Sequence, residues 1–219
     1  MLNAIIFDMD GTLFQTNTIL ELSLEDAFQR LRDKNLWNEK TPIEKYRDIM
    51  GIPLPQVWEA LLPQHSKEVR AETDAYFLER LVGNIRNGKG ALYPYVTEIL
   101  PLLKENGYSI FIASNGLPTY LKAIVKYYTL DKWVTETFSI AQIDTLDKAD
   151  LVKLVVDKYN ISSGAVVGDR LSDIQAAKAN DLLAIGCNFD FAKEKELVQA
   201  DKVIDNLREL HTVLPSILK

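Results

Sequence analysis

The chain opens with Ala4-Ile5-Ile6-Phe7-Asp8-Met9-Asp10-Gly11-Thr12, a short apolar run that ends in an acidic turn. Four consecutive apolar residues bounded by turn residues predict a strand that is buried on both faces, as in a parallel sheet. Gly11 allows the backbone to turn, so the Asp8 side chain and the Asp10 carbonyl can face one cation. An ordinary acidic turn at a strand end is the alternative interpretation.

Four more runs of this kind predict further buried strands, at residues 109–113, 165–167, 183–186 and 202–204. Helical patterns lie between them, with apolar faces that include Leu121 with Ile124, Leu151 with Val155, and Leu210 with Leu214. Strands that alternate with helices predict an α/β fold with a doubly wound, Rossmann-like parallel sheet. In such a sheet the functional site lies beyond the carboxyl ends of the strands.

Residues 16–90 interrupt this alternation with helical patterns and no convincing strand. One apolar stripe runs through Leu20, Leu24, Phe28 and Leu31. The run Thr41-Pro42-Ile43-Glu44 predicts a capping box with proline at the first helical position, opening a helix that Gly51 can end. We therefore expect an inserted helical cap domain at 16–90 and a core domain at 1–15 and 91–219. Residues 84–90 are the expected return linker.

Polar residues follow two of the other predicted strands, and others lie at the starts of predicted helices. Ser114 and Asn115 offer a hydroxyl and backbone amides before a helix, which can cradle an anion. Lys148 opens a helix where the helix dipole disfavours a cation, which suggests an external partner, although a solvated surface lysine is the alternative. Asp169 takes the place after its strand that Asp8 takes after the first. Asp173 falls on the first turn of the next helix, where the dipole alone can explain it.

Together these segments resemble the four signature motifs of the haloacid dehalogenase-like superfamily, in order and in spacing. The resemblance covers essentially the whole chain, and the insertion stands where the helical-cap members carry their cap. That subgroup includes phosphoglycolate phosphatases and beta-phosphoglucomutases. The most specific motifs are the first, with Asp8, Asp10, Gly11 and Thr12, and the fourth, with Gly168, Asp169 and Asp173.

The resemblance implies a magnesium-dependent phosphatase that hydrolyses a small phosphorylated metabolite. Asp8 is then the nucleophile that forms an aspartyl-phosphate, and Asp10 is the general acid and base. The implied phosphate-binding residues are Ser114, Asn115 and Lys148. The implied metal ligands are Asp8, Asp10, Asp169 and Asp173. Four clustered carboxylates against one lysine also require a divalent cation on electrostatic grounds, and Mg²⁺ suits a site made of oxygen atoms.

Other functions remain open at this stage. A phosphomutase of the beta-phosphoglucomutase type uses the same core residues. Asp10 argues against halide displacement, because cleavage of a carbon–halogen bond needs no proton on its leaving group. A catalytically silent binding protein is a third interpretation, which the intact motifs disfavour. The substrate stays open among nucleotides, phosphoglycolate and sugar phosphates, with Arg47, Gly51 and Arg170 as candidate substrate residues.

Composition argues against several classes of function. The net charge of -6 over 219 residues argues against a nucleic-acid partner, which needs a basic surface. No apolar stretch reaches membrane-spanning length and no signal sequence opens the chain, so we expect a cytoplasmic protein without a membrane partner, monomeric or a small homo-oligomer. Cys187 has no partner for a disulfide and is expected to be a small buried apolar residue. His65 and His211 are expected to be structural.

Overall fold

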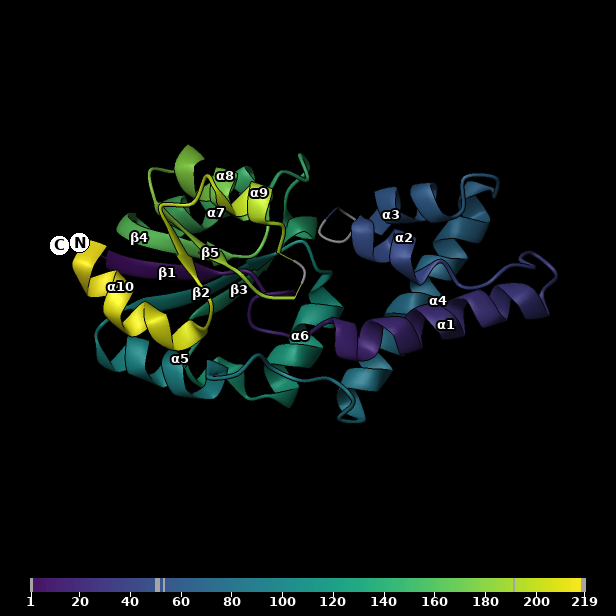
Figure 1. Ribbon diagram of the computed structural model, residues 1–219, viewed down its shortest axis with the longest axis horizontal. Coiled ribbons are helices and arrows are strands. Elements are labelled where there is room, and N and C mark those ends of the chain that lie inside the picture. The colour runs from purple at the N-terminus through teal and green to yellow at the C-terminus, as the bar shows by residue number, and fades with distance from the viewer. Residues whose placement is uncertain (1, 50–51, 53, 191, 218–219) are drawn as a thin grey trace. The chain divides into compact units, whose positions relative to one another are not determined.

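The computed structural model describes residues 2–49, 52, 54–190 and 192–217 (Figure 1). Contacts divide the chain into two compact units. Unit 1 comprises Met1–Gln15 and Leu92–Lys219, and unit 2 comprises Thr16–Ala91. Among the residues described, we find no helix with the length and apolar character that crossing a membrane requires.

Unit 1 is built on a six-stranded parallel sheet in the order β3-β2-β1-β4-β5-β6. Its strands are β1 (Leu2–Phe7), β2 (Ser109–Ser114), β3 (Glu136–Ser139), β4 (Ile161–Gly168), β5 (Leu183–Cys187) and β6 (Lys202–Ile204). Ala4, Ile5, Ile6 and Phe7 of β1 are completely buried, as expected for a central strand covered on both faces. The predicted doubly wound α/β core is confirmed. The sequence analysis did not predict β3, which lies at the sheet edge.

Helices cover both faces of this sheet (Figure 1). On one face lie α5 (Val96–Glu105), α6 (Pro118–Tyr127) and α10 (Leu210–Ile217), and on the other lie α7 (Lys148–Tyr159), α8 (Leu171–Ala179) and α9 (Glu194–Leu197). Short 3-10 turns occur at Leu130–Lys132, Ile140–Gln142 and Leu207–Glu209. The chain builds β2 and β3 on one side of β1 and then crosses back to build β4, β5 and β6 on the other. The order therefore reverses between β1 and β4, and the carboxyl ends of these neighbours meet at the switch point.

Unit 2 consists of α1 (Asn17–Asp33), α2 (Ile43–Asp48), α3 (Leu54–Leu61) and α4 (Lys67–Arg86). Its core contains the buried rings of Phe28, Trp58 and Phe77. The Trp58 and Phe77 rings meet edge to face with centroids 5.4 Å apart, an arrangement that aromatic pairs favour. The indole Nε1 of Trp58 donates a hydrogen bond to Asp74 at 2.7 Å, so the buried ring keeps its polar atom satisfied.

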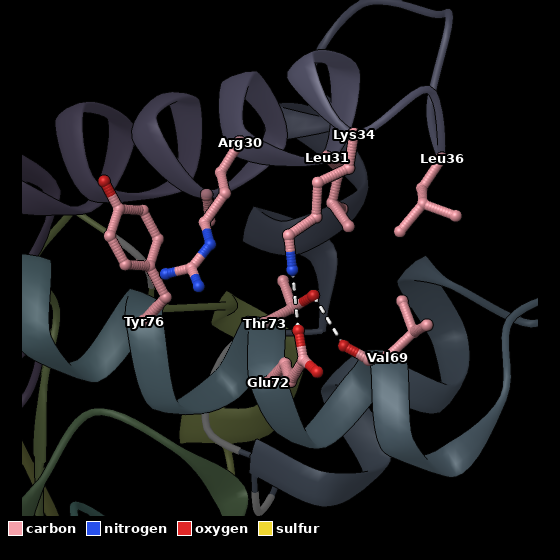
Figure 2. A pocket seen from close by; sticks show the side chains of 9 residues that line it. Arg30, Leu31, Lys34, Leu36, Val69, Glu72, Thr73 and Tyr76 are labelled. Carbon is pink, nitrogen blue, oxygen red and sulfur yellow. Dashed lines mark hydrogen bonds and ion pairs between the residues drawn. The ribbon is translucent and has the colours of Figure 1, made fainter.

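Figure 2 shows the surface where α1 packs against α4. The Arg30 guanidinium lies 4.4 Å from the centroid of the Tyr76 ring, and Lys34 Nζ lies 2.7 Å from a carboxylate oxygen of Glu72. The cavity between these side chains has a volume of about 10 Å³. This is room for about one water molecule at most, so the surface is a packed helix contact and not a ligand site.

Two details of the predicted insertion are wrong at the level of single residues. The N-cap of α2 is Pro42, without a side-chain cap, and the Thr41 hydroxyl instead accepts a hydrogen bond from Arg32. The expected linker at 84–90 begins too early, because α4 continues through Arg86. Asn84 is buried within α4 and donates a hydrogen bond to Ser23 of α1 at 2.9 Å. Gly51, the expected end of α2, lies outside the described residues, and α2 ends at Asp48.

The close pairing of β1 with β4 leads to a first prediction. A Cβ atom at Gly164 would lie 2.2 Å from the backbone oxygen of Ala4, its partner in the register, whereas a Cβ at Gly83 in α4 would meet nothing within 4 Å. We expect Gly164→Ala to lower the free energy of unfolding by about 1–3 kcal/mol or more. The Ala4 oxygen belongs to the backbone of a central strand and cannot move aside as a flexible side chain can. The matched control Gly83→Ala should raise it by roughly 0.5–1 kcal/mol. Urea unfolding of both variants is the measurement, and equal stability would contradict the packing described.

Candidate active site

The site begins in the tight turn that follows β1. The backbone amide of Asp8 still donates to Val167 of β4 at 2.9 Å, so the sheet fixes this residue up to its Cα atom. The amides of Leu13 and Phe14 then both donate to the Met9 carbonyl, at 2.9 and 2.8 Å. The Met9 amide donates to Asp8 Oδ1 at 2.7 Å and sets the direction of that carboxylate.

Lys148 joins the ends of three segments that are far apart in the sequence. Its Nζ lies 2.8 Å from Asp8 Oδ1 and 3.0 Å from Asp173 Oδ1. The Lys148 side chain is 3% exposed, so it is not a solvated surface lysine. Lys148, the cation at the start of α7, therefore pairs with two carboxylates of the same chain, Asp8 and Asp173.

Asp169 lies beneath the turn that contains Gly11. Its carboxyl group is 2% exposed and its Oδ1 accepts a hydrogen bond from the Thr12 hydroxyl at 3.3 Å. Gly11 has a φ of +73°, and a Cβ atom there would lie 2.4 Å from Asp169 Oδ2. Both the backbone angle and the contact therefore require glycine at this position.

Asp173 lies on the first turn of α8 and is almost completely buried. Its Oδ2 accepts a hydrogen bond from the Arg170 amide at 3.1 Å, so it also caps the helix. A Cβ atom at Gly168 would lie 2.2 Å from the Asp173 carboxyl carbon. The glycine at the end of β4 thus allows this carboxylate to approach the strand.

Asp8, Asp169 and Asp173 can together hold a metal ion. Each offers a carboxylate oxygen, and the three oxygens lie within 4.8 Å of one another. Three buried acidic groups face one lysine, so a cation would compensate the remaining negative charge. The all-oxygen donor set fits a hard divalent ion. The Asp10 carboxylate is not part of this group of ligands among the described residues.

The charges in the site shift one another's ionisation. Burial, and then the negative charges of Asp173 and Asp8, raises the pKa of Asp169 well above its ordinary value. Burial also raises the pKa of Asp173 to about 6, although Lys148 opposes the shift. For Lys148 burial disfavours the ammonium ion, but Asp173 and Asp8 outweigh burial, so its pKa lies above the ordinary value. The lysine therefore stays charged, while the two aspartates hold protons more tightly than usual.

The turn after β2 lies at the same edge of the sheet. Ser114 is 1% exposed, and its Oγ accepts a hydrogen bond from the Gly116 amide at 3.1 Å. The hydroxyl of Ser139, at the end of β3, donates to the Gly116 carbonyl at 2.7 Å. Asn115 lies between Ser114 and Gly116 in the sequence and is partly exposed. The sequence analysis did not identify Ser139, because it is the last residue of the strand that was missed.

Asp10 has a partner that the sequence analysis did not identify. The hydroxyl of Tyr120, on the first turn of α6, donates a hydrogen bond to Asp10 Oδ1 at 2.5 Å. The signal in the sequence that could have identified Tyr120 is its place in the first turn of the helix after a strand. This signal is weak, because a tyrosine on an apolar helix face is also typical of a core residue.

The candidate substrate residues have other partners or are not described. Arg47, in α2 of unit 2, pairs with the carboxylates of Glu21 and Glu44. Arg170 Nε lies 3.3 Å from Glu196. Gly51 lies outside the described residues. Cys187 is completely buried, as expected, and burial raises its pKa.

Comparison with known proteins agrees with this fold. A family model described as a haloacid dehalogenase-like hydrolase matches residues 2–181. A 5'-nucleotidase of Pseudomonas aeruginosa is 23% identical over 200 residues, covering 88% of this chain and 86% of the relative. A phosphoglycolate phosphatase of Haemophilus influenzae is 26% identical over 226 residues, covering 95% of this chain and 96% of the relative. The crystal structure of CbbY from Rhodobacter sphaeroides in complex with phosphate superposes with a TM-score of 0.81 at 20% identity, covering 96% of each chain.

The parallel sheet and the buried aspartates at its switch point define an α/β protein with a candidate metal site. The chain belongs to the haloacid dehalogenase-like hydrolase family, because the family model spans most of its length. The resemblance drawn from the sequence motifs is thereby confirmed, and the protein is an enzyme of that family.

The contact between Gly11 and Asp169 leads to a second prediction. Gly11→Ala combines an unfavourable positive φ with a collision, whereas Gly107→Ala, at a φ of +85° with open space around it, carries the backbone cost alone. We expect Gly107→Ala to lower the free energy of unfolding by about 1–2 kcal/mol, and Gly11→Ala to lower it by a further 1–3 kcal/mol or so. Chemical unfolding in the presence of a chelator measures both. Equal losses would show that Asp169 does not lie against the turn.

Proposed function

We propose that the protein is a magnesium-dependent phosphatase that hydrolyses a small phosphomonoester through an aspartyl-phosphate on Asp8. The observation that carries this proposal is the position of Lys148 between Asp8 and Asp173, beside the third buried carboxylate of Asp169. A nucleophile needs a free anionic oxygen, and a phosphoryl group needs nearby positive charge. This arrangement can offer both at the carboxyl ends of β1 and β4.

In the proposed reaction the Asp8 carboxylate attacks phosphorus and the bond from phosphorus to the leaving oxygen breaks. Asp10 gives its proton to that oxygen, so that the product leaves as a neutral alcohol. Asp10 then takes a proton from a water molecule, whose oxygen attacks the same phosphorus and releases Asp8 and inorganic phosphate. Lys148, with Ser114 and Asn115, binds the phosphoryl oxygens during both steps.

Asp8, Asp169 and Asp173 would hold Mg²⁺ through their carboxylates and Asp10 through its backbone carbonyl. When bound, the ion offsets the repulsion between these carboxylates and a dianionic phosphate. Magnesium suits the site because it is a hard cation that prefers oxygen ligands.

Residues 16–90 form the proposed cap domain, which would select the part of the substrate beyond the phosphoryl group. Relatives named a 5'-nucleotidase and a phosphoglycolate phosphatase support a small phosphorylated metabolite as the substrate class. The proposal places the enzyme in the cytoplasm, as a monomer or small homo-oligomer, and the single buried cysteine agrees with a reducing compartment.

A third prediction tests the activity directly. The purified protein with MgCl₂ should hydrolyse at least one member of a panel of nucleoside monophosphates, phosphoglycolate, sugar phosphates and p-nitrophenyl phosphate. Asp8→Asn should lower kcat by at least about 10³-fold, because an amide is a poor nucleophile. Asp131→Asn, on the exposed 3-10 turn of unit 1, should leave kcat unchanged. Substantial turnover by a clean Asp8→Asn preparation would exclude the covalent mechanism.

A fourth prediction concerns pH and the metal. The raised pKa values of Asp169 and Asp173 mean that the metal-free folded state binds protons more tightly than the unfolded chain. Their stabilising contribution is therefore present at low pH and is lost as pH rises through the pKa of Asp173, about 6. Mg²⁺ must displace these protons, so it should raise the Tm more at pH 7.5 than at pH 5.5.

Thermal unfolding with EDTA and with MgCl₂ at the two pH values measures this effect. Asp169→Asn is the control, in which the shift caused by Mg²⁺ should largely disappear at both pH values. A shift of the same size at pH 5.5 and 7.5 in the unchanged protein would contradict the assignment of these carboxylates to the metal.

A further inference from the structure

The hydrogen bond between Tyr120 and Asp10 joins two segments that the sequence motifs treat separately. Asp10 lies in the turn after β1, and Tyr120 lies on α6, which follows the turn after β2. The bond is short, at 2.5 Å, and Tyr120 is 5% exposed. We propose that Tyr120 is a positioning residue that fixes the Asp10 carboxyl group for proton transfer, a role that rests on the proposed function.

Packing fixes the phenol ring before the hydrogen bond is considered. The ring meets Phe14 edge to face, with centroids 6.4 Å apart and an interplanar angle of 78°. On another side it lies against the backbone of Gly116, where a Cβ atom would be 3.0 Å from Tyr120 Cδ1. Because Phe14 pairs with Asp10 through an isolated bridge, the ring is anchored to the same turn that carries the carboxylate.

A fixed hydroxyl donor suits a group that acts first as an acid and then as a base. The Tyr120 hydroxyl donates to Oδ1, which accepts a hydrogen bond as a carboxylate oxygen and equally as the carbonyl oxygen of a carboxyl group protonated on Oδ2. The same bond therefore orients Asp10 in both halves of the proposed reaction. A lysine at position 120 would favour only the ionised form.

The position of the bond also connects phosphate binding to proton transfer. Gly116, which seats the ring, belongs to the turn after β2 and is held there by Ser114 and Ser139. The carboxyl group that protonates the leaving oxygen is thereby held relative to the turn proposed to bind the phosphoryl group. Small misplacements between such groups reduce rates strongly, so a positioning residue is expected to act on kcat more than on KM.

Tyr128 provides a matched control. Its ring also contacts Phe14, with centroids 6.0 Å apart, but among the described residues its buried hydroxyl has no hydrogen-bond partner. Tyr128→Phe and Tyr120→Phe each remove one phenolic oxygen next to the same ring. Only the second removes a contact to Asp10.

The experiment compares the two variants on substrates with different leaving groups. An alkyl phosphate needs a proton on its departing oxygen, whereas p-nitrophenolate leaves without one. We expect Tyr120→Phe to lower kcat/KM for the alkyl phosphate by about 10- to 100-fold, a part of what general acid catalysis supplies. Its kcat/KM for p-nitrophenyl phosphate should stay within about twofold of the unchanged enzyme, since protonation contributes little there. Tyr128→Phe should match the unchanged enzyme on both substrates.

Two further readouts separate positioning from folding. Tyr120→Phe should show a burst of p-nitrophenolate, because the base that activates water in the second step is also misplaced. In an Asp10→Asn background, Tyr120→Phe should cause no additional loss, since both changes then act on the same group. The Tm of each variant reports on the fold.

The outcomes distinguish this inference from the proposed function. If the unchanged enzyme hydrolyses no phosphomonoester, the proposed function fails. If it is active and Tyr120→Phe behaves like Tyr128→Phe, Tyr120 does not position Asp10. Equal losses in kcat/KM on both substrates, or additive losses with Asp10→Asn, would likewise overturn the inference, because the hydroxyl would then act on the nucleophile or the phosphoryl group.

Discussion

The burial of three carboxylates against one ammonium group constrains the rest of the structure. Asp8, Asp169 and Asp173 lose most of their hydration, and Lys148 approaches only two of them closely. Such a cluster is costly unless each oxygen has a partner or a further cation is present. Backbone amides, the Thr12 hydroxyl and the lysine supply partners. Burial, and then the negative charges of Asp173 and Asp8, still raises the pKa of Asp169.

The sheet topology is what brings these groups together. β1 and β4 are neighbours although about 150 residues separate them along the chain. Their carboxyl ends lie side by side only because the strand order reverses between them. The glycines at positions 11 and 168 then allow the backbone to approach the carboxylates of Asp169, directly after β4, and Asp173, in α8. A larger residue at either position would collide with these carboxylates. Fold and charge cluster thus depend on the same few contacts.

The sequence predicted those parts of the molecule in which a strong local pattern coincides with burial. The continuous apolar runs identified five strands, and the residues after them included Asp8 and Asp169. Lys148 and Asp173 were identified at the starts of helices. β3 was missed because it is a four-residue edge strand that starts with the half-exposed Glu136. The predictions of a capping box at Thr41 and of a linker starting at Asn84 were wrong. The Thr41 hydroxyl instead accepts a hydrogen bond from Arg32, and the Asn84 side chain donates one to Ser23, and neither contact is visible in the local sequence pattern.

Tyr120, the proposed positioning residue, shows why sequence patterns find candidate reacting groups more readily than the residues that would orient them. A carboxylate directly after a buried strand is unusual, so it suggests a functional role. A tyrosine on an apolar helix face is already explained by the burial of its apolar ring, so its hydroxyl suggests no further role. What distinguishes Tyr120 is that its hydroxyl donates a hydrogen bond to Asp10. This contact depends on how α6 lies against the turn after β1, which the sequence pattern does not reveal. Asp8 and Asp173 each accept a hydrogen bond from a nearby backbone amide, which suits their proposed role as metal ligands with one fixed geometry. Asp10 accepts a hydrogen bond from a side chain on another element. Such a bond holds the carboxyl plane and is compatible with the proton transfer proposed for Asp10.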